Sequence, residues 1–373
     1  MNAVLAHAPR LHHTLVDAGV RTQPCLVLLG TGTVGRAFVQ RYDQLAGNGG
    51  IALPRFELLA NSRGTRACGN DAMHALHAAV GLPQAALHAP VTVFDAASLD
   101  AGDIVVDATA SDAIAARHAM WLESGIHVVT ANKLGNGADL VRAEAIARAQ
   151  RASGAEYGDS ATVGAGLPLL RSLRELVAGG DRIHVVEGVL SGSLAWLFDH
   201  FDGMRPFSGF VREAMSAGYT EPDPRIDLSG EDVRRKLLIL ARAAGLPLQA
   251  DDIDVDSLVP ELLAAASIDA LDARLPVLDV PLRSRYQQAY RDGAKLRFVG
   301  RFEIDAHGCR ASVGLRALPV MHPLCGGSGT DNRVAIHSCR YRDQPLIIQG
   351  PGAGAEVTAA ALLDDVLRIT RDK

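Results

Sequence analysis

Side chains that could hold an amino group and move a proton gather in one stretch, GYTEPDPRIDLSGEDVRRK, at residues 218–236. The first part of this stretch is acidic and carries three carboxylates, those of Glu221, Asp223 and Asp227. The second part carries Asp232 and Lys236, four residues apart. A carboxylate attracts an ammonium group, and a lysine beside an acid can give or take a proton. The stretch is therefore the first candidate for a catalytic site.

The acidic loop allows more than one interpretation. Pro222 and Pro224 restrict its backbone and so fix the directions of the neighbouring acids. Three carboxylates so close together repel one another unless a cation binds or water screens them. The ammonium group of a substrate would meet that need, and so would a divalent cation, although the spacing differs from that of an EF-hand loop. The alternative is a solvated acidic loop.

A helix is expected directly after Gly230, and it would carry an acid and a lysine side by side. Ser229 followed by Asp232 resembles a capping arrangement at its start. One face of the helix is apolar at about 100° per residue and consists of Val233, Leu237, Leu240 and Ala244. Lys236 lies at the margin of this face, where it would be partly desolvated and held by Asp232. The alternative is an exposed ion pair, worth less than about 1 kcal/mol.

Near its start the chain has the pattern of a phosphate-binding turn. The apolar run CLVLL at residues 25–29 is followed by GTGTVG and then by the helix-compatible RAFVQRYDQL. The first glycine of such a turn permits a tight bend, the second lets the backbone approach a pyrophosphate, and the third allows close packing of helix on strand. The candidate cofactor-binding residues of this turn are Gly30, Thr31, Gly32, Thr33, Val34 and Gly35.

Further strand-like runs alternate with helical segments, which predicts an α/β fold with a doubly wound, Rossmann-type parallel sheet. The expected strands lie at residues 56–62, 91–94, 103–109 and 126–132. Ligands of such sheets bind beyond the carboxyl ends of the strands. Three short segments fall there: 61–63, 107–111 and 132–133.

The end of the second strand bears on the choice of cofactor. NAD-binding units usually have an acid there for the ribose hydroxyls, whereas a 2′-phosphate favours arginine. This chain has Arg63, with Arg66 nearby, so NADP(H) is expected to be preferred over NAD(H). The alternative is that both are solvated loop charges. Lys133 directly follows a buried-looking strand and is a second candidate for chemistry, unless it is a surface lysine.

Composition excludes several classes of protein. The chain has 373 residues, enough for two domains, and a net charge of −5 with no basic stripe, which argues against a nucleic-acid partner. Five widely spaced cysteines without a CxxC pair indicate a reducing cytoplasm. No apolar run reaches the roughly 18 residues of a membrane helix, and no signal peptide is recognisable.

Together these motifs resemble the homoserine dehydrogenase family, above all the dehydrogenase half of bifunctional aspartokinase–homoserine dehydrogenases. The motifs are GTGTVG, TANK, ATVGAGLPLL, LSGSL, GYTEPDPRIDLSGEDVRRKLLILAR and GPGAGAEVTAA. The resemblance implies a reversible, NAD(P)H-dependent reduction of L-aspartate 4-semialdehyde to L-homoserine, in the biosynthesis of threonine, methionine and isoleucine. Nothing in the sequence resembles an aspartokinase or ACT domain, so feedback inhibition through such a domain is not expected.

The resemblance also implies roles for single residues. Lys236 would be the general acid and base, assisted by Lys133. The implied substrate-binding residues are Glu221, Asp227 and Asp232. Further implied cofactor contacts are Thr109, Lys133, Gly218 and Gly354. A sodium ion would be held by the main-chain carbonyls of Ser160, Val163, Ala165 and Leu167, although the family usually has a carboxylate in place of Ser160.

We therefore expect three parts of the chain. Residues 1–23 would be an N-terminal extension, residues 24–157 with 346–373 the NAD(P)-binding domain, and residues 158–345 an α+β catalytic domain that also forms a homodimer. Two alternatives remain open. One is another amino-acid-linked dehydrogenase, acting on malate-like or aspartate-like substrates. The other is a non-catalytic NADP(H)-sensing protein whose acidic loop contacts a partner.

Overall fold

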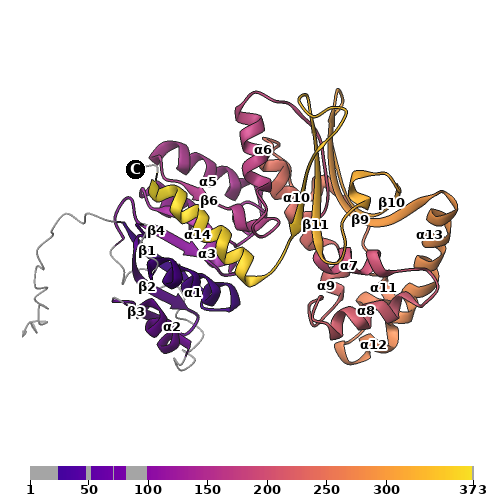
Figure 1. Cartoon of the computed structure of the whole chain (residues 1–373), viewed down its shortest axis with the longest axis horizontal. Coiled ribbons are helices and arrows are strands. Elements are labelled where there is room, and N and C mark those ends of the chain that lie inside the picture. Colours follow the sequence, from indigo (N-terminus) through magenta and orange to yellow (C-terminus); the bar gives the residue numbers. More distant parts are fainter. Residues whose placement is uncertain (1–23, 48–51, 70, 81–98, 372–373) are drawn as a thin grey trace, which may run out of the picture.

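The computed structural model describes residues 24–47, 52–69, 71–80 and 99–371 of the chain. These residues form two lobes, each built on a six-stranded sheet (Figure 1). The expected N-terminal extension at 1–23 and the expected strand at 91–94 lie outside the described residues.

The first sheet confirms the predicted Rossmann-type architecture. Its strand order is β3-β2-β1-β4-β5-β6, and all neighbours are parallel except the β2–β3 hairpin. Strands β1, β4 and β5 are entirely buried, as expected for a parallel sheet covered by helices on both faces. The bounds are β1 Cys25–Leu29, β2 Arg55–Asn61, β3 Gly64–Ala67, β4 Ile104–Asp107, β5 His127–Thr130 and β6 Tyr157–Gly158.

Helices from both ends of the chain cover this sheet. In Figure 1 the C-terminal helix α14 crosses the first lobe beside α1, and the two helices contact each other. The return of the C-terminus to the nucleotide domain, expected from the sequence, is therefore confirmed. The segment SDAIAARHAMWLESG forms two short helices, α3 and α4. The bounds are α1 Thr33–Gly47, α2 Ala72–Val80, α3 Asp112–Ala115, α4 His118–Glu123, α5 Leu140–Ser153 and α14 Ala355–Arg371.

The second sheet has the order β12-β11-β7-β9-β10-β8 and is antiparallel apart from the β8–β10 pair. Its strands are β7 Ile183–Val189, β8 Ile253–Val255, β9 Ala294–Asp305, β10 Gly308–Pro319, β11 Asp331–Ser338 and β12 Leu346–Pro351. The helices of this lobe are α6 Leu169–Ala178, α7 Gly192–His200, α8 Phe207–Ser216, α9 Arg225–Leu228, α10 Glu231–Ala243, α11 Glu261–Ala264, α12 Leu271–Arg274 and α13 Asp279–Arg291.

One detail of the expected division of the chain is wrong. The sequence assigned residues from 346 onward to the nucleotide domain, but β12 pairs with β11 along its whole length. This pairing satisfies backbone groups on that side of β11, so the chain leaves the second sheet only after residue 351. The other expected boundaries stay predictions.

Two arginines connect the lobes. From α10, Arg242 donates to the carbonyls of Asn136 (2.6 Å) and Ala138 (2.7 Å), which follow β5. From α6, Arg174 makes a two-pronged pair with Asp159, at 2.6 and 2.8 Å. Burial alone would raise the pKa of Asp159, but the charge and hydrogen bonds of Arg174 outweigh it, and the pKa is lowered. The loop after β5 is thus fixed against the second lobe.

Candidate active site

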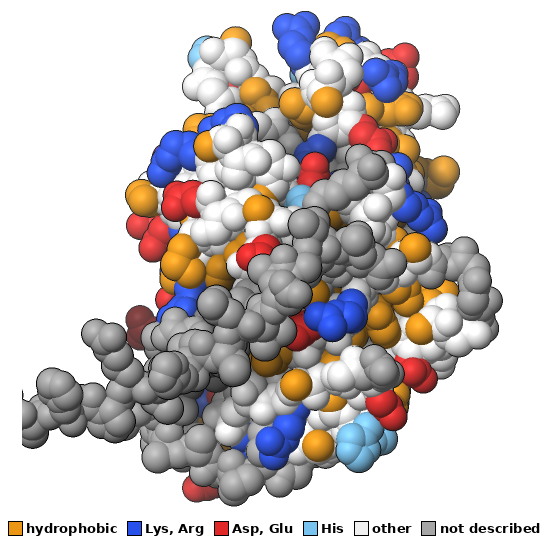
Figure 2. Space-filling model, turned by 90° about the vertical axis from the view of Figure 1, so that its left-hand side faces the viewer, with side chains coloured by type: hydrophobic (Ala, Val, Ile, Leu, Met, Phe, Trp, Pro, Cys, Tyr) orange, Lys and Arg blue, Asp and Glu red, His pale blue; other side chains and the backbone are white. Residues whose placement is uncertain are grey.

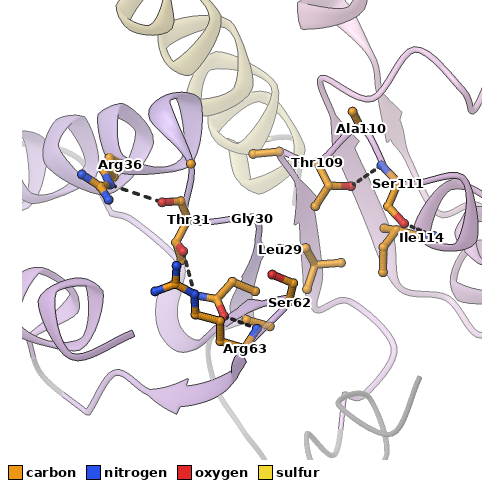
Figure 3. Close-up of a pocket in the computed structure, with 14 residues that line it drawn as sticks. Leu29, Gly30, Thr31, Arg36, Ser62, Arg63, Thr109, Ala110, Ser111 and Ile114 are labelled. Atoms are coloured by element: carbon orange, nitrogen blue, oxygen red, sulfur yellow. Dashed lines mark hydrogen bonds between the residues drawn. The ribbon is translucent and has the colours of Figure 1, made fainter. Parts of the chain in front are cut away.

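A cavity of about 510 Å³ opens at the carboxyl ends of β1, β2 and β4. It contains five of the predicted cofactor residues, namely Gly30, Thr31, Gly32, Arg63 and Thr109. Figure 3 shows Thr31, Arg36 and Arg63 at one end of this cavity and Thr109 and Ser111 at the other. The position matches the place where open α/β sheets bind ligands.

The three glycines of the turn have three different environments. Gly30 has a φ of +95°, and a Cβ there would lie 2.8 Å from the carbonyl oxygen of Ala108. A Cβ on Gly35 would collide with the carbonyl of Gly30, so this glycine lets helix α1 lie close to the turn. Around Gly32 a Cβ would meet nothing within 4 Å, so its backbone is open to a ligand. The turn therefore fits the phosphates of a dinucleotide.

Polar contacts join the glycine turn to the end of β2. The Thr31 hydroxyl accepts a hydrogen bond from the side-chain amide of Asn61 at 2.9 Å, and Asn61 Oδ1 accepts one from the main-chain N–H of Arg63 at 2.8 Å. Arg36, which sequence reasoning missed, donates to the carbonyl of Thr31 at 3.3 Å. Its place in the first turn of the helix after GTGTVG was an available signal. Two cations, Arg36 and Arg63, thus line the cavity.

The remaining predicted cofactor residues lie elsewhere. Thr33 and Gly32 line a second hollow together with Ala355 and Glu356, directly after Gly354, so the C-terminal glycine loop meets the first one. Val34 packs against the apolar core of the first lobe. Gly218 follows α8 with a φ of +72° and does not line the main cavity.

The two candidate lysines meet at one carboxylate. Lys236 of α10 is only 8% exposed, and its Nζ lies 2.8 Å from Asp232 Oδ2 and 2.8 Å from the carbonyl oxygen of Leu190. Lys133, which follows β5 in the other lobe, lies 3.4 Å from Asp232 Oδ1. Burial alone would raise the pKa of Asp232, but the two ammonium groups outweigh it and hold this pKa at about 2. Asp232 is therefore a carboxylate that joins the lobes.

The small-residue turn after β7 links this cluster to the acidic loop. The Leu190 carbonyl contacts Lys236, and the hydroxyls of Ser191 and Ser193 lie 2.8 Å apart. Ser193 in turn donates to Asp227 Oδ1 at 2.6 Å. Asp227 is therefore oriented from the same turn as the buried lysine.

The three acids of the loop separate into different roles. Asp223 pairs with Arg225, and this pair lowers the pKa of Asp223. Asp227 Oδ2 accepts the main-chain N–H of Glu221 at 2.9 Å. The Glu221 residue is exposed, so its carboxylate is open to a ligand. The repulsion inferred from the sequence is thus partly relieved by Arg225.

The capping arrangement expected at the start of α10 is wrong. The N-cap is Gly230, with a φ of +79° and no side chain, and the Ser229 hydroxyl accepts the N–H of Glu231 at 3.2 Å rather than that of Asp232. A Cβ at Gly230 would lie 2.9 Å from the ring of Phe298, so close packing on β9 favours glycine there. Asp232 is free of a capping role because its carboxylate contacts the lysines. The expected apolar face is confirmed, since Val233, Leu237 and Leu240 are buried.

The expected sodium ligands lie in the segment between β6 and α6. Ala165 has a φ of +51°, a left-handed conformation that is unusual for alanine, directly after Gly164 at +74°. The Leu167 carbonyl accepts one hydrogen bond, from Leu169 at 2.8 Å, which leaves a lone pair available. Ser160 donates to Asp365 from both its main chain and its hydroxyl. This backbone is compatible with carbonyl ligation of a cation, and the side chain of Ser160 is engaged elsewhere.

Two family models match most of the chain. Residues 168–367 match homoserine dehydrogenase, and residues 30–158 match its NAD binding domain. The first lobe is therefore a domain for a nicotinamide dinucleotide. In the described part of the chain, no helix combines the length and apolar character needed to cross a membrane.

Individual proteins with similar sequences or structures agree. Homoserine dehydrogenase of Schizosaccharomyces pombe is 40% identical over 273 residues, which cover 71% of this chain and 72% of that protein. Bifunctional aspartokinase/homoserine dehydrogenase 1 of Zea mays is 47% identical over 268 residues, 72% of this chain but only 29% of the maize protein.

The chain thus spans less than a third of the maize protein. A solved structure of a Candida auris protein of unknown function superposes with a TM-score of 0.81 at 35% identity, covering 93% of this chain and 98% of that one. The extent of the family models and the yeast relative settle the family. The chain belongs to the homoserine dehydrogenase family.

Proposed function

We propose that this protein catalyses the reversible, NAD(P)H-dependent reduction of L-aspartate 4-semialdehyde to L-homoserine. The observation that carries this proposal is the position of Lys236. Its nearly buried amine lies at the junction of the lobes, beside Asp232 and near Lys133, which follows a strand of the nucleotide domain. When bound, the cofactor supplies the hydride for this reaction.

The residues of the chain perform the proton transfer. Lys236 directs two of its N–H groups at Asp232 and Leu190, which leaves a third for the carbonyl oxygen of the substrate. A fixed ammonium group in a site with little water stabilises negative charge that develops on that oxygen, and then donates its proton. In the reverse direction the same amine accepts a proton. Lys133 adds a second positive charge at the same carboxylate.

The acidic loop is proposed to bind the amino group of the substrate. Glu221 is exposed, and Asp227 is oriented by Ser193 and by the Glu221 main chain. A substrate ammonium between these carboxylates would offset their repulsion. Among the described residues, no group of three acidic, histidine or cysteine side chains is placed to hold a metal ion.

We propose that NADP(H) is preferred over NAD(H), because Arg36 and Arg63 both line the cavity near the end of β2. An Arg63→Ala variant is expected to lose about tenfold in kcat/KM with NADP and little with NAD. Arg66→Ala, in the neighbouring exposed position, is the matched control. An equal loss with both cofactors would contradict a 2′-phosphate contact.

A sodium ion is proposed on the carbonyls of Ser160, Val163, Ala165 and Leu167, supported by the left-handed backbone at Ala165. Thermal unfolding in sodium chloride and in tetramethylammonium chloride at equal ionic strength tests this. A higher unfolding temperature in sodium is expected, and identical curves would exclude a bound ion.

We further propose a homodimer formed through the second lobe and a reducing, cytoplasmic setting. No disulfide joins any of the five cysteines, all of which lie within the described residues, which supports the setting. Sedimentation velocity tests the assembly: a species of twice the chain mass is expected, and a monomer at micromolar concentration would overturn it.

The test of the reaction itself is an initial-rate measurement of cofactor reduction with L-homoserine. Malate and aspartate serve as competing substrates and distinguish the alternative dehydrogenases. We expect turnover with homoserine alone. Absence of turnover together with tight NADPH binding would favour the non-catalytic sensing protein instead.

A further inference from the structure

The carboxylate of Asp107, the last residue of β4, is completely buried and still accepts four hydrogen bonds. Its Oδ1 accepts from the main-chain N–H and from the hydroxyl of Thr109, at 2.9 and 2.7 Å. Its Oδ2 accepts from the Asn132 amide and from the His118 ring, both at 3.0 Å. A carboxylate is costly to bury unless its acceptor sites are used in this way. The orientation of the carboxylate is therefore fixed by two donors to each oxygen.

His118 is held in a defined orientation behind this carboxylate. Its Nδ1 lies 3.0 Å from the hydroxyl of Tyr157, and both rings are buried. Burial raises the pKa of Tyr157 well above its usual range, so the phenol keeps its proton. Because a carboxylate oxygen accepts, Nε2 of His118 donates to Asp107. A Cβ at Gly135 would collide with the Tyr157 hydroxyl, so the loop after β5 lies directly on this pair.

The two carboxylate oxygens of Asp107 contact residues of two different parts of the site, the cofactor cavity and the loop that carries Lys133. On one side, the hydroxyl proton of Thr109 is committed to Asp107, so this cavity-lining hydroxyl presents only lone pairs to other groups. On the other side, Asn132 is anchored to Asp107 and to the Ser111 carbonyl (2.9 Å), and its own oxygen accepts the Leu134 N–H at 3.1 Å.

Lys133 is therefore fixed through the residues on both sides of it. Its amine reaches Asp232 in the other lobe. The same buried carboxylate thus holds a residue of the cofactor cavity and the residue that precedes an interlobe lysine. Catalysis of hydride and proton transfer requires these two parts to keep a constant separation.

We propose that Asp107, oriented by His118, is a positioning residue that sets the Thr109 end of the cavity, which lies opposite Arg63 and which we assign to the nicotinamide, against Lys133 and Lys236. This inference rests on the proposed function for its chemistry. Asp107 touches neither substrate nor cofactor in this account. It acts through Thr109 and Asn132, and Tyr157 and His118 determine which way its partners point.

The test compares two ligands, NADPH and 2′-phospho-ADP-ribose, which lacks the nicotinamide. Asp107→Asn replaces one acceptor oxygen by a donor, so either Thr109 or Asn132 loses its partner. By calorimetry, NADPH affinity is expected to fall about tenfold while that of 2′-phospho-ADP-ribose stays within about twofold. An equal loss for both ligands, or no loss for either, would overturn the proposal.

A matched pair at His118 keeps the test decisive if Asp107→Asn folds poorly. His118→Gln can still donate to Asp107 and accept from Tyr157, whereas His118→Leu can do neither. The glutamine variant is expected to bind both ligands like the wild type, and the leucine variant to lose NADPH selectively. Equal behaviour of the two would contradict positioning. If the wild type oxidised no homoserine, the proposed function would be wrong. The binding comparison would still test whether Asp107 positions Thr109 and Asn132.

Discussion

The glycine-rich cavity of the first lobe and the lysine cluster between the lobes are built in opposite ways. The cavity is lined by short segments that follow the neighbouring strands β2, β1 and β4 of one sheet. The cluster is formed by side chains on different lobes, Lys133 on one and Asp232 and Lys236 on the other. A glycine turn that binds phosphates depends on a short local sequence, whereas a cluster of this kind depends on where side chains from distant segments meet.

The surroundings of the two sites differ as well. Charged side chains of both signs are interspersed on the described part of the face of the first lobe (Figure 2). The lysine cluster instead includes two residues of α10, a helix whose apolar face is buried in the core of the second lobe. We expect changes to the cavity to act on cofactor affinity and changes to the cluster to act on turnover.

Two glycine variants would break the cavity in distinguishable ways. Gly35→Ala drives a methyl group into the Gly30 carbonyl and is expected to lower both the melting temperature and cofactor affinity. Gly32→Ala meets no protein atom, so it is expected to keep the melting temperature but to weaken NADPH binding about 100-fold by blocking the phosphates. Calorimetry and thermal unfolding measure both. The control is Gly47→Ala on the same helix, and normal NADPH binding by Gly32→Ala would refute the assignment.

Asp232→Asn would break the cluster without touching the cavity. We expect kcat to fall about 100-fold with NADPH affinity unchanged, because the two lysines lose their shared carboxylate. Glu231→Gln, the exposed neighbour on α10, is the control.

This variant also has a predicted pH signature. The folded pKa of Asp232 is about 2, below its unfolded value. The lowered pKa of Asp232 therefore contributes to the free energy of unfolding above pH about 4, and this contribution is lost as the pH falls toward about 2. Urea unfolding of wild type and Asp232→Asn should differ at pH 6 and converge at low pH. Curves that differ equally at both pH values would show that the ammonium groups do not stabilise this carboxylate.

The smallest expected effect concerns the connection between the lobes. Arg174→Gln removes the two-pronged contact with buried Asp159 and is expected to cost about 1–2 kcal/mol, a figure reduced because Arg174 is itself 42% exposed. Because the pKa of Asp159 is lowered, the stability difference between wild type and Arg174→Gln should be largest at neutral pH and should shrink below pH about 4. Arg171→Gln, in an exposed pair on the same helix, should be nearly neutral. A fall in kcat under conditions in which the variant is fully folded would place Arg174 in the chemistry.

The same contrast explains what the sequence could predict. The Rossmann-type sheet and the glycine turn were predictable because their signals are local: an apolar run, three glycines at fixed spacing and a helix. Lys133, Asp232 and Lys236 could be nominated one by one from their residue types. Their meeting could not, because it depends on how the two lobes pack. The contact of Lys236 with the Leu190 carbonyl left no trace in the sequence either, since any residue has a carbonyl.

Local signals also misled in specific places. Ser229 and Asp232 have the spacing of a capping pair, but Gly230, packed closely on Phe298, is the N-cap of α10 instead. Residues from 346 onward were assigned to the nucleotide lobe, but the ladder with β11 places β12 in the second sheet. The contacts of Asp107 could not be predicted because its four hydrogen bonds come from three residues in separate segments, Thr109, His118 and Asn132.

The most direct test of the account is the turnover of Lys236→Ala beside Lys295→Ala, an exposed lysine of the same lobe. The account predicts that kcat for homoserine oxidation falls by about 10²–10⁴-fold in Lys236→Ala, with NADPH affinity within about twofold of wild type. Lys295→Ala should behave as wild type. Turnover by Lys236→Ala at the wild-type rate would contradict the claim that this amine moves the proton.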